Sequence, residues 1–457
     1  MVPITLLKLV ENNSFLSTLS SLYHGNGFEF YLVGGAVRDG ILDIPTNDFD
    51  FTTNATPEES IELLKKNNYK TTEVGKVFGT IELYDQERVV HITTFRKDTY
   101  ETDSRNPEIE KATDLITDLA RRDFTVNSIA YSLETNELID PFSGLKDLAS
   151  GTISTPDDPI ISFSDDPLRM LRVCRFASTH GFSPDNETYI AMKENIERIK
   201  IITKERIRDE INKLLVGKSP SMGIRTLVES GLSLYIIPEI NELKIEVDPK
   251  HHHKDVYEHT LAVLDGVPPK LTLRMGALLH DIAKPNTKGI ENGKVHFRHH
   301  EVVGARMTKK ILKELKYDNK TIENIALLVE QHLRPHTFKM GWTDSAVRRY
   351  IVDAGHMLED LNELVRADVT TKNKVKAKEI YENLDEMEKR IEEVKAKEEL
   401  SKIRPALSGD EVMEHFNIQP GPKVGVIMKA LYEQRINDGE VSKEDALKLA
   451  EETYKNL

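Results

Sequence analysis

The sequence predicts an α+β protein in which a small sheet domain precedes a long helical remainder. Short apolar segments with alternating polar residues are confined to residues 1–150. Apolar residues at helical spacing dominate the rest, for example in residues 371–404. A chain of 457 residues exceeds one ordinary hydrophobic core, so we expect several domains.

Composition restricts the classes of protein to consider. The formal net charge of −14 argues against a generally basic nucleic-acid binder, although a local basic groove would still act within the Debye length of about 8 Å. Cys174 is the only cysteine, which excludes an internal disulfide or a cysteine-based zinc site and fits a reducing compartment. No segment approaches the length of a membrane span, and the N-terminus lacks a basic start. We therefore expect a cytoplasmic protein without a membrane partner.

The most informative stretch begins with an apolar strand. We expect residues 1–27 to form a helix that leads into this strand, residues 30–33. Gly34 and Gly35 follow as a tight turn in which a phosphate can approach the backbone. A helix then begins, with Arg38 in its first turns.

A pair of acids follows on a second strand. Residues 48–51 alternate acid and phenylalanine, so Asp48 and Asp50 project to one face while the rings face the core. Two neighbouring acids repel each other, and a divalent cation between them would remove the repulsion. Oxygen ligands of this kind suit Mg²⁺ that carries a nucleoside triphosphate. The alternative is a solvated strand edge, but the preceding glycine turn and arginine favour phosphoryl or nucleotidyl transfer.

The remainder of the sheet domain contains one helix, two strands and a polar segment. We expect a helix over residues 57–66 and alternating strands over residues 77–84 and 89–94. Residues 95–119 are too irregular for a periodic element and are expected to form a surface loop.

Two arginines come next. Arg121 and Arg122 can each bind a triphosphate through a forked guanidinium, and Asp123 can fix one of them or bind a sugar hydroxyl. Further on, Ser164 as N-cap and Gly181 as a stop predict a helix over residues 165–179.

That helix would carry its charged residues on one side. Asp165, Arg169 and Arg172 are spaced i, i+4, i+7 and share a helical face. An ordinary ion pair on a helix surface is the alternative interpretation. Beyond it, residues 371–404 predict a long helix with one packed face, and another helix is expected to begin near Lys423.

A second cluster of polar residues lies in residues 251–368. Its histidines and acids are flanked by apolar helical residues, which would place imidazoles inside a helical bundle. Neutral imidazole together with carboxylate suits Mn²⁺, Fe, Co, Ni or Zn. A buried histidine that merely satisfies its own hydrogen bonds is the alternative for any single member. The candidates are His259, His280, Asp281, His300, His332 and Asp368.

Several motifs resemble those of a known family. The string G-G-A-V-R-D followed by D-x-D, and then A-R-R-D-F-T-V-N-S-I-A, resembles the class II tRNA nucleotidyltransferases and bacterial poly(A) polymerases, a branch of the polymerase-β-like superfamily. The resemblance implies that Asp48 and Asp50 hold two Mg²⁺ ions while the RNA 3′ hydroxyl attacks the α-phosphate and pyrophosphate leaves. Where the family often has a third carboxylate, this sequence has His91.

The resemblance also implies a set of nucleotide-binding residues. In the family, the segment with Asp165 and Arg169 reads the incoming base directly, and here aspartate replaces the usual glutamate. The polar run resembles the loop that CCA-adding members use to switch from CTP to ATP, with Asp103 and Arg105 as its charged parts. The implied nucleotide-binding set is Gly34, Gly35, Arg38, Arg121, Arg122, Asp123, Asn127, Asp165, Asp166, Arg169 and Arg172.

The second cluster resembles another superfamily. Its order H, H-D, D is similar to that of the HD phosphohydrolases, which implies His259, His280, Asp281 and Asp368 as ligands of a divalent transition metal. His300 and His332 are candidates for a second metal or for binding phosphate.

Together these expectations give four domains and one principal function. We expect a nucleotidyltransferase head in residues 1–150, a nucleotide-selecting neck in 151–243, an HD body in 244–370 and a tRNA-binding helical tail in 371–457. The resemblance, closest to the actinobacterial type, implies addition of CCA to tRNA from CTP and ATP. The alternatives are a poly(A) polymerase, a CC-adding or A-adding enzyme, or an HD phosphohydrolase whose first domain only binds RNA.

Overall fold

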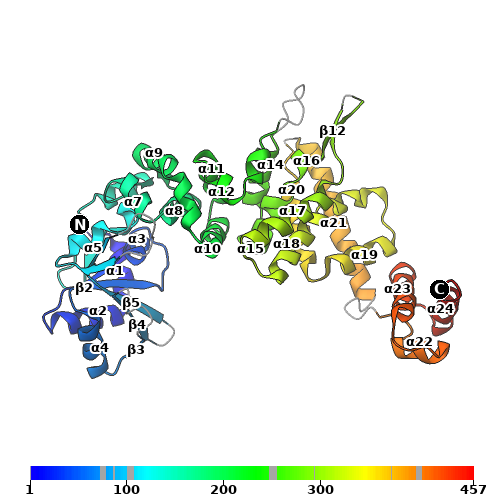
Figure 1. Ribbon diagram of the computed structural model, residues 1–457, viewed down its shortest axis with the longest axis horizontal. Coiled ribbons are helices and arrows are strands. Elements are labelled where there is room, and N and C mark those ends of the chain that lie inside the picture. Colours follow the sequence, from blue (N-terminus) through cyan, green and yellow to red (C-terminus); the bar gives the residue numbers. More distant parts are fainter. Residues whose placement is uncertain are drawn as a thin grey trace. The chain divides into compact units, whose positions relative to one another are not determined.

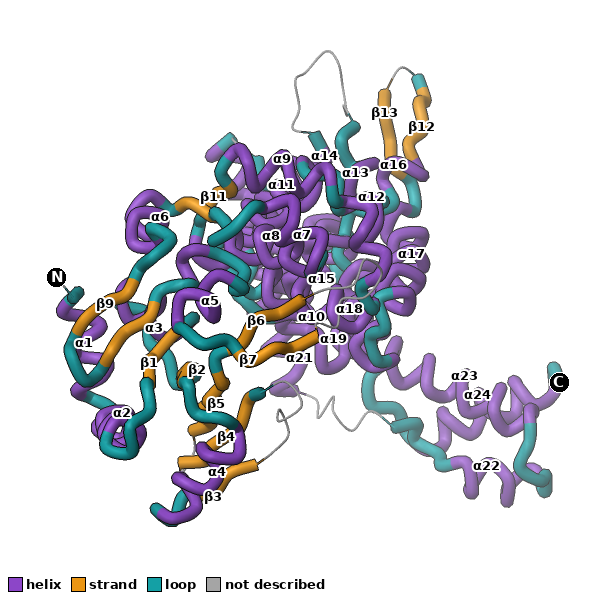
Figure 2. Tube along the Cα trace, turned by 60° about the vertical axis from the view of Figure 1, so that its left-hand side comes forward, coloured by secondary structure: helices purple, strands orange, loops and turns teal. Residues whose placement is uncertain are grey.

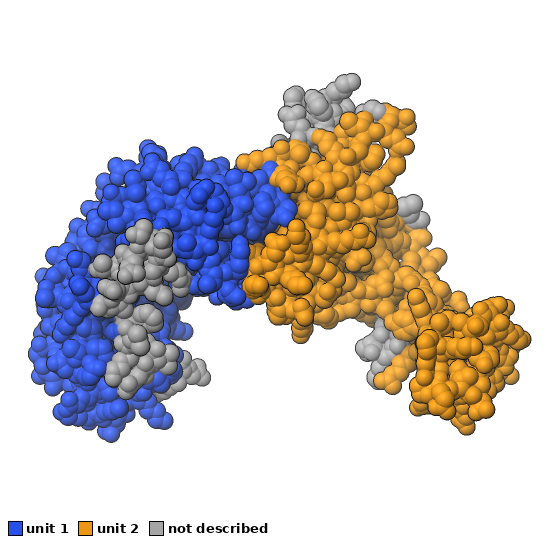
Figure 3. Space-filling model, viewed as in Figure 1, with its two compact units in different colours: residues 1–241 blue, residues 242–457 orange. Residues whose placement is uncertain are grey.

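A computed structural model describes most of the chain as two compact units, residues 1–241 and 242–457 (Figure 3). Unit 1 contains a mixed sheet with helices and unit 2 is mainly helical, so the expected α+β class is confirmed. The described residues are 2–72, 79–85, 88–99, 108–245, 255–292, 294–371, 373–397 and 404–457.

The sheet of unit 1 has seven strands in the order β3-β4-β5-β2-β1-β8-β9 (Figure 2). β2 and β5 run parallel, and every other neighbouring pair is antiparallel. In this order the strands are β3 (Lys70–Thr72), β4 (Thr80–Asp85), β5 (Arg88–Thr94), β2 (Phe49–Thr53), β1 (Phe30–Val33), β8 (Ala130–Ser132) and β9 (Glu137–Ile139).

The register of this sheet aligns three polar residues. Asp50 on β2 lies opposite His91 on β5, and Glu82 on β4 lies opposite His91 from the other side. Directly paired residues share a face of the sheet, so these three side chains form a row across three strands. On β2 the alternation is as predicted, because Phe49 and Phe51 are fully buried while Asp50 is half-exposed.

The helices before and around the sheet differ from the prediction at one place. The single helix expected over residues 1–27 is two helices, α1 (Ile4–Glu11) and α2 (Ser14–His24). Asn13 separates them. Its side-chain amide donates to the Leu9 carbonyl at 2.6 Å, so this carbonyl has a hydrogen-bond partner although the helix does not continue. α3 (Gly35–Ile41) and α4 (Pro57–Lys66) form where expected.

The polar run is more ordered than predicted. β6 (Arg96–Thr99) pairs with β7 (Glu108–Lys111), and α5 (Leu115–Ala120) follows. The expectation of an irregular loop was wrong at both ends because Phe95, Leu115 and Leu119 are buried in one core cluster and anchor these elements. Asp103 and Arg105, assigned to nucleotide switching, lie outside the described residues.

The helix expected over residues 165–179 is also two helices. α7 (Pro159–Asp165) ends and α8 (Leu168–His180) begins at Pro167, whose ring lacks the N–H a helix needs. Asp166 before it is extended, with φ −129° and ψ 94°, as the residue before a proline prefers. Asp165 therefore does not share one helical face with Arg169 and Arg172.

The remaining elements of unit 1 are short connections and the helices beside α8 (Figure 1). They are η2 (Thr125–Asn127), α6 (Gly144–Ser150), β10 (Thr152–Ile153), β11 (Ser183–Pro184), α9 (Asn186–Glu194), η3 (Ile196–Ile201), α10 (Lys204–Leu215), α11 (Pro220–Glu229), α12 (Ser233–Ile236) and α13 (Glu239–Glu242, whose last residue opens unit 2).

Unit 2 is a helical bundle with one hairpin and a small C-terminal group of helices. The bundle comprises α14 (Val256–Gly266), α15 (Leu271–Leu279), α16 (Lys284–Thr287), β12 (Lys288–Glu291), β13 (Lys294–Phe297), α17 (His300–Glu314), α18 (Asn319–Gln331), η4 (Arg334–Met340), α19 (Asp344–Ala354), η5 (Gly355–Met357), α20 (Leu358–Asp368) and α21 (Lys374–Lys397).

The last three helices have a core of their own. α22 (Gly409–Phe416), α23 (Pro422–Asp438) and α24 (Lys443–Lys455) pack around Val412, Ile427 and Leu431. α23 begins after Gly421 and α21 covers most of residues 371–404, as the sequence predicts. Within the described part of the chain, no helix combines the length and apolar character that crossing a bilayer requires.

Candidate active site and candidate metal centre

The acid pair lies at the start of β2. Asp48 precedes the strand and Asp50 is its second residue, and their side chains are 77 % and 44 % exposed. Each offers an oxygen within 4.8 Å of a ring nitrogen of His91 and of the other acid. Burial and the neighbouring Asp50 carboxylate raise the pKa of Asp48. A divalent cation would remove this repulsion, so the donor set fits a metal.

The glycine turn brings an arginine to the acid pair. Gly34 has φ 70°, and a Cβ there would lie 3.2 Å from Arg122 Nη1 and 3.6 Å from Asp50 Oδ2. Glycine is therefore required both by the backbone conformation and by the space between arginine and acid. Gly35 follows as the first residue of α3, and a Cβ at that position would lie 3.6 Å from Arg38 Nη2.

The two adjacent arginines are held by an acid that the sequence analysis missed. Asp118 on α5 is fully buried, and its oxygens accept from Arg121 Nη2 at 2.7 Å and Arg122 Nη2 at 3.1 Å. The Thr52 hydroxyl on β2 also donates to Asp118, at 3.1 Å. Burial opposes ionisation of Asp118, but the two guanidinium groups outweigh it and lower its pKa. The available signal was its position three and four residues before the arginines, at the end of α5.

A cavity of about 180 Å³ collects four of the predicted nucleotide-binding residues. Arg169 is held there by donating to the Arg121 carbonyl at 2.6 Å and to Ser162 Oγ at 2.7 Å. Burial raises the pKa of Asp165, and Arg169 opposes the shift. Although Pro167 separates their helices, Asp165 and Arg169 line the same cavity. The predicted residues that line this cavity are Arg121, Arg122, Asp165 and Arg169.

Four of the other predicted residues, Arg38, Asn127, Asp123 and Arg172, form a separate series of contacts. Asp123 forms an ion pair with Arg172 and accepts from Asn127 Nδ2 at 2.9 Å. Asn127 in turn accepts from Arg38 Nη1 at 2.7 Å. Asp166 Oδ1 accepts from the backbone N–H of Leu168 at 3.1 Å, at the start of α8. None of these side chains is among the described residues that line the 180 Å³ cavity.

Unit 2 brings the six candidate metal ligands together from five helices. They form two groups, each with donor atoms within 4.8 Å of one another. His259 comes from α14, His280 and Asp281 follow α15, His300 begins α17, His332 follows α18 and Asp368 ends α20. The first group is His259, His280 and Asp368, and the second is Asp281, His300 and His332.

Asp281 connects the two groups. Its Oδ2 lies 3.2 Å from His280 Nε2 and 3.4 Å from His259 Nε2. Its Oδ1 lies 3.2 Å from His300 Nε2 and 3.9 Å from His332 Nε2. One carboxylate therefore faces both groups, as a ligand shared by two cations would.

The imidazole rings are oriented by their other nitrogens. The Nδ1 atoms of His280, His300 and His332 donate to backbone carbonyls three residues earlier, at 2.7–2.8 Å. This fixes the tautomer so that each Nε2 lone pair faces the cluster, the usual arrangement of metal-binding histidines. Burial lowers the pKa of His332 to about 3, so its ring is neutral, as a metal ligand must be.

Three buried atoms in the cluster make no hydrogen bond within the described part of the chain: Asp281 Oδ1, His300 Nε2 and His332 Nε2. A buried polar atom left unsatisfied costs about 1–3 kcal/mol. A metal ion would satisfy all three, so the residues fit a divalent cation.

Two further residues that the sequence analysis missed contact this cluster. Lys284 Nζ lies 2.6 Å from Asp281 Oδ2, and His336 Nε2 lies 3.4 Å from Asp368 Oδ2. Lys284 is three residues after Asp281, and His336 is four residues after His332. These short spacings were the only signal in the sequence.

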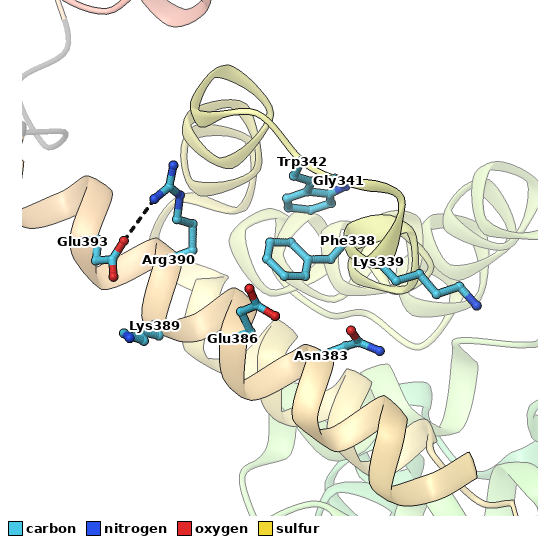
Figure 4. A pocket seen from close by; sticks show the side chains of 9 residues that line it. All are labelled: Phe338, Lys339, Gly341, Trp342, Asn383, Glu386, Lys389, Arg390 and Glu393. Atoms are coloured by element: carbon cyan, nitrogen blue, oxygen red, sulfur yellow. Dashed lines mark hydrogen bonds and ion pairs between the residues drawn. The ribbon is translucent and has the colours of Figure 1, made fainter.

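A cavity of about 460 Å³ lies between η4 and α21, apart from the predicted residues (Figure 4). Side chains of both charge signs surround two aromatic rings there, and Arg390 is paired with Glu393. It is lined by Phe338, Lys339, Gly341, Trp342, Asn383, Glu386, Lys389, Arg390 and Glu393.

Arg122 lines the 180 Å³ cavity and lies close to Gly34, which also approaches Asp50. Unit 1 thereby has the features of a nucleotidyltransferase. Family models agree: the Poly A polymerase head domain matches residues 30–154, the "Probable RNA and SrmB- binding site of polymerase A" matches 181–244, and the HD domain matches 251–403.

Two curated relatives cover nearly the whole chain. The A-adding tRNA nucleotidyltransferase of Deinococcus radiodurans is 30 % identical over 418 residues, 88 % of this chain and 91 % of that protein. The CCA-adding enzyme of Geobacillus sp. (strain WCH70) is 30 % identical over 417 residues, covering 91 % of this chain and 90 % of the relative. The chain belongs to the class II tRNA nucleotidyltransferase and poly(A) polymerase family, with an HD domain.

A solved structure shares the fold. The CCA-adding enzyme of Bacillus stearothermophilus, in complex with CTP, superposes with a TM-score of 0.70 at 24 % identity. The match covers 96 % of this chain and 97 % of that one.

Proposed function

We propose that this chain adds the terminal CCA to the 3′ end of tRNA, taking CTP and ATP without a nucleic-acid template and releasing pyrophosphate. The observation that carries the proposal is the acid pair at the start of β2, because Gly34 lies close to both Asp50 and Arg122, and Arg122 also lines the 180 Å³ cavity. The name of one near-full-length relative, the A-adding tRNA nucleotidyltransferase, supports tRNA as the acceptor.

The residues of unit 1 divide the chemical work. Asp48 and Asp50 would hold Mg²⁺, which supplies the charge that activates the 3′ hydroxyl and neutralises the phosphates. Arg121 and Arg122 bind the triphosphate through their forked donors. The buried Asp118 holds both guanidinium groups in place, so little side-chain entropy is lost when nucleotide binds.

Selection of the base falls to Asp165 and Arg169, which line the same cavity. Asp165 supplies hydrogen-bond acceptors and Arg169 supplies donors, which together can pair with the edge of an incoming base. Arg169 is already fixed by the Arg121 carbonyl and Ser162, so its free donors point in a defined direction. The cavity therefore replaces a template strand.

The number of nucleotides added distinguishes the alternatives. One near-full-length relative is A-adding and the other is CCA-adding, so addition of A alone is the main rival. The test uses labelled tRNA transcripts that end before CCA, after C and after CC, each with CTP, ATP or both. Addition of three nucleotides followed by a stop supports the proposal, whereas addition of A only to the CC-ended transcript assigns the A-adding function.

Two variants test whether the acid pair is needed for nucleotide addition. Asp50→Asn should abolish extension of every transcript, while Glu62→Gln should leave it unchanged, because Glu62 is exposed on α4 and pairs with Lys66. Long A runs on any RNA would instead indicate a poly(A) polymerase. If wild type and Asp50→Asn both extend nothing, the proposed transfer is wrong.

We also propose the functional division of the chain. Residues 1–150 transfer the nucleotide, 151–243 select it, 244–370 bear the HD site and 371–457 contact the tRNA. The proposed tRNA substrate supports a cytoplasmic location.

A second activity is proposed for unit 2. The three unpartnered buried atoms around Asp281 favour a divalent transition metal, and such a site suits hydrolysis of a phosphoester. The test measures hydrolysis of RNA ending in a 2′,3′-cyclic phosphate, and of a nitrophenyl phosphodiester, with Mn²⁺, Co²⁺, Ni²⁺ or Zn²⁺.

Two variants separate hydrolysis by this site from contamination. Asp281→Asn removes the carboxylate that faces both ligand groups and should abolish hydrolysis. His356→Gln changes an exposed histidine on η5 outside the cluster and should not. Hydrolysis that survives Asp281→Asn would exclude the cluster as its source.

A further inference from the structure

His91 occupies a position between acids on two strands. The parallel register places it opposite Asp50, and the antiparallel register places it opposite Glu82. Its Nδ1 lies 3.4 Å from Asp50 Oδ1 and 3.7 Å from Asp48 Oδ1. Neighbouring ligands of an octahedral cation with bonds of about 2.1 Å lie about 3 Å apart, so only a small adjustment separates these three atoms from coordination.

The other ring nitrogen faces an acid that is itself fixed. His91 Nε2 lies 3.9 Å from Glu82 Oε1. Glu82 Oε2 accepts from the hydroxyls of Thr72 at 3.0 Å and Tyr84 at 2.8 Å, which leaves Oε1 for the imidazole. A carboxylate that accepts from one ring nitrogen directs the lone pair of the other nitrogen, here toward the acid pair.

We propose that His91 is a nitrogen ligand of the nucleotidyltransferase metal site, that Glu82 positions it, and that the site consequently prefers Mn²⁺ to Mg²⁺. This inference rests on the proposed nucleotidyl transfer. Mg²⁺ takes oxygen ligands in a strict octahedron and accepts imidazole poorly, whereas Mn²⁺ tolerates mixed nitrogen and oxygen ligands. A protonated His91 that merely pairs with Asp50 is the competing interpretation, since Asp50 raises the pKa of His91.

Direct detection of nitrogen on Mn²⁺ distinguishes the two. The chain is prepared with the unit 2 cluster weakened by His280→Ala and Asp281→Ala, and any nitrogen signal from its remaining histidines would persist when His91 is changed. One equivalent of Mn²⁺ is added with a non-hydrolysable CTP analogue, and electron spin echo envelope modulation is recorded. We expect a directly bound ¹⁴N that becomes ¹⁵N on labelling histidine and disappears in His91→Asp. Absence of bound nitrogen in the protein that retains His91 would overturn the proposal.

Metal preference gives a second readout. The ratio of single-nucleotide addition rates with Mn²⁺ and with Mg²⁺ should shift at least about tenfold toward Mg²⁺ in His91→Asp, since the new donor is an oxygen. Glu82→Ala should weaken Mn²⁺ binding about 10- to 100-fold while leaving the nitrogen bound at saturation. An unchanged ratio in His91→Asp, or unchanged affinity in Glu82→Ala, would contradict the assigned roles.

The design keeps this inference separate from the proposed function. If the chain adds no nucleotide with either metal, the transfer proposal fails, but the spin-echo experiment still reports whether His91 binds the ion. If His91→Asp lowers the thermal unfolding midpoint so far that it is not folded, His91→Asn replaces it, because its amide oxygen is also a hard donor.

Discussion

The carboxylate of Asp118 lies 3.1 Å from Arg122 Nη2 and is itself fully buried. Because Asp118 also binds Arg121 and accepts from Thr52, it connects the arginine pair to the strand that carries Asp50. The acid therefore fixes where a triphosphate can bind relative to the metal site, although it need not touch the nucleotide.

Removing this charge should weaken both stability and nucleotide binding. Asp118→Asn removes the buried negative charge that the two guanidinium groups share, and we expect the free energy of opening this region to fall by about 3 kcal/mol. Native-state hydrogen exchange of peptides from α5 and β2 measures it. Asp114→Asn on the same helix is the matched control, because asparagine keeps the N-cap. A larger KM for nucleotide only in Asp118→Asn is expected, and equal KM values would contradict the role.

Gly34→Ala tests the close approach in the turn. The backbone there has φ 70° and ψ −136°, a glycine conformation, and the new Cβ would meet Arg122 Nη1. We expect a backbone cost of about 1–3 kcal/mol and about 100-fold slower nucleotide addition. Gly27→Ala is the control, since it also has positive φ, 81°, but its Cβ would meet nothing within 4 Å. Thermal unfolding and single-turnover rates separate the effects, and equal rates in the two variants would contradict the steric argument.

Local patterns were sufficient to predict the centre of the site. The apolar strand, the glycine turn and the alternation around Asp50 are all written in consecutive residues, and the structure has each of them. Spaced histidines with adjacent apolar residues likewise predicted a bundle interior, and all six candidates meet there. Side chains whose chemistry depends on near neighbours in the sequence can therefore be predicted from the sequence alone.

Features set by distant residues were not predictable. Glu82 acquires its relation to His91 only through strand register, and Asp118 acquires its hydrogen bond from Thr52 only when α5 packs beside β2. The break before α8 is different, because Pro167 was visible and its missing N–H should have outweighed the attractive N-cap at Ser164. A favourable N-cap at Ser164 does not start a helix that must continue through Pro167, because the proline forces Asp166 before it into extended backbone.

The ion pair between Asp123 and Arg172 predicts a pH dependence. Burial opposes ionisation of Asp123, but Arg172 and Asn127 outweigh it and hold its pKa below the ordinary value of 3.8. A lowered folded pKa means that the stabilisation is complete above about pH 5 and is lost as pH falls, because the unfolded chain takes up the proton first.

We therefore expect protection of α8 against hydrogen exchange to fall between about pH 5 and pH 3, and to fall less steeply in Asp123→Asn. Asp185→Asn keeps the N-cap of α9 and should retain the wild-type slope. Parallel slopes in wild type and Asp123→Asn would show that other groups determine the pH dependence.

Metal binding by unit 2 should stabilise it without affecting nucleotide transfer. A cation that binds only the folded cluster adds about 2.7 kcal/mol at 100 times its dissociation constant, so Mn²⁺ should raise the unfolding midpoint and EDTA should lower it. Trp342, the only tryptophan, lies in unit 2, so its fluorescence follows this unfolding selectively. Asp281→Asn should lose the Mn²⁺-dependent shift because Asp281 faces both ligand groups, and His356→Gln should keep it. Full tRNA extension by Asp281→Asn is also expected, since the acid pair belongs to unit 1; loss of extension with an intact fold would show that the two sites depend on one another.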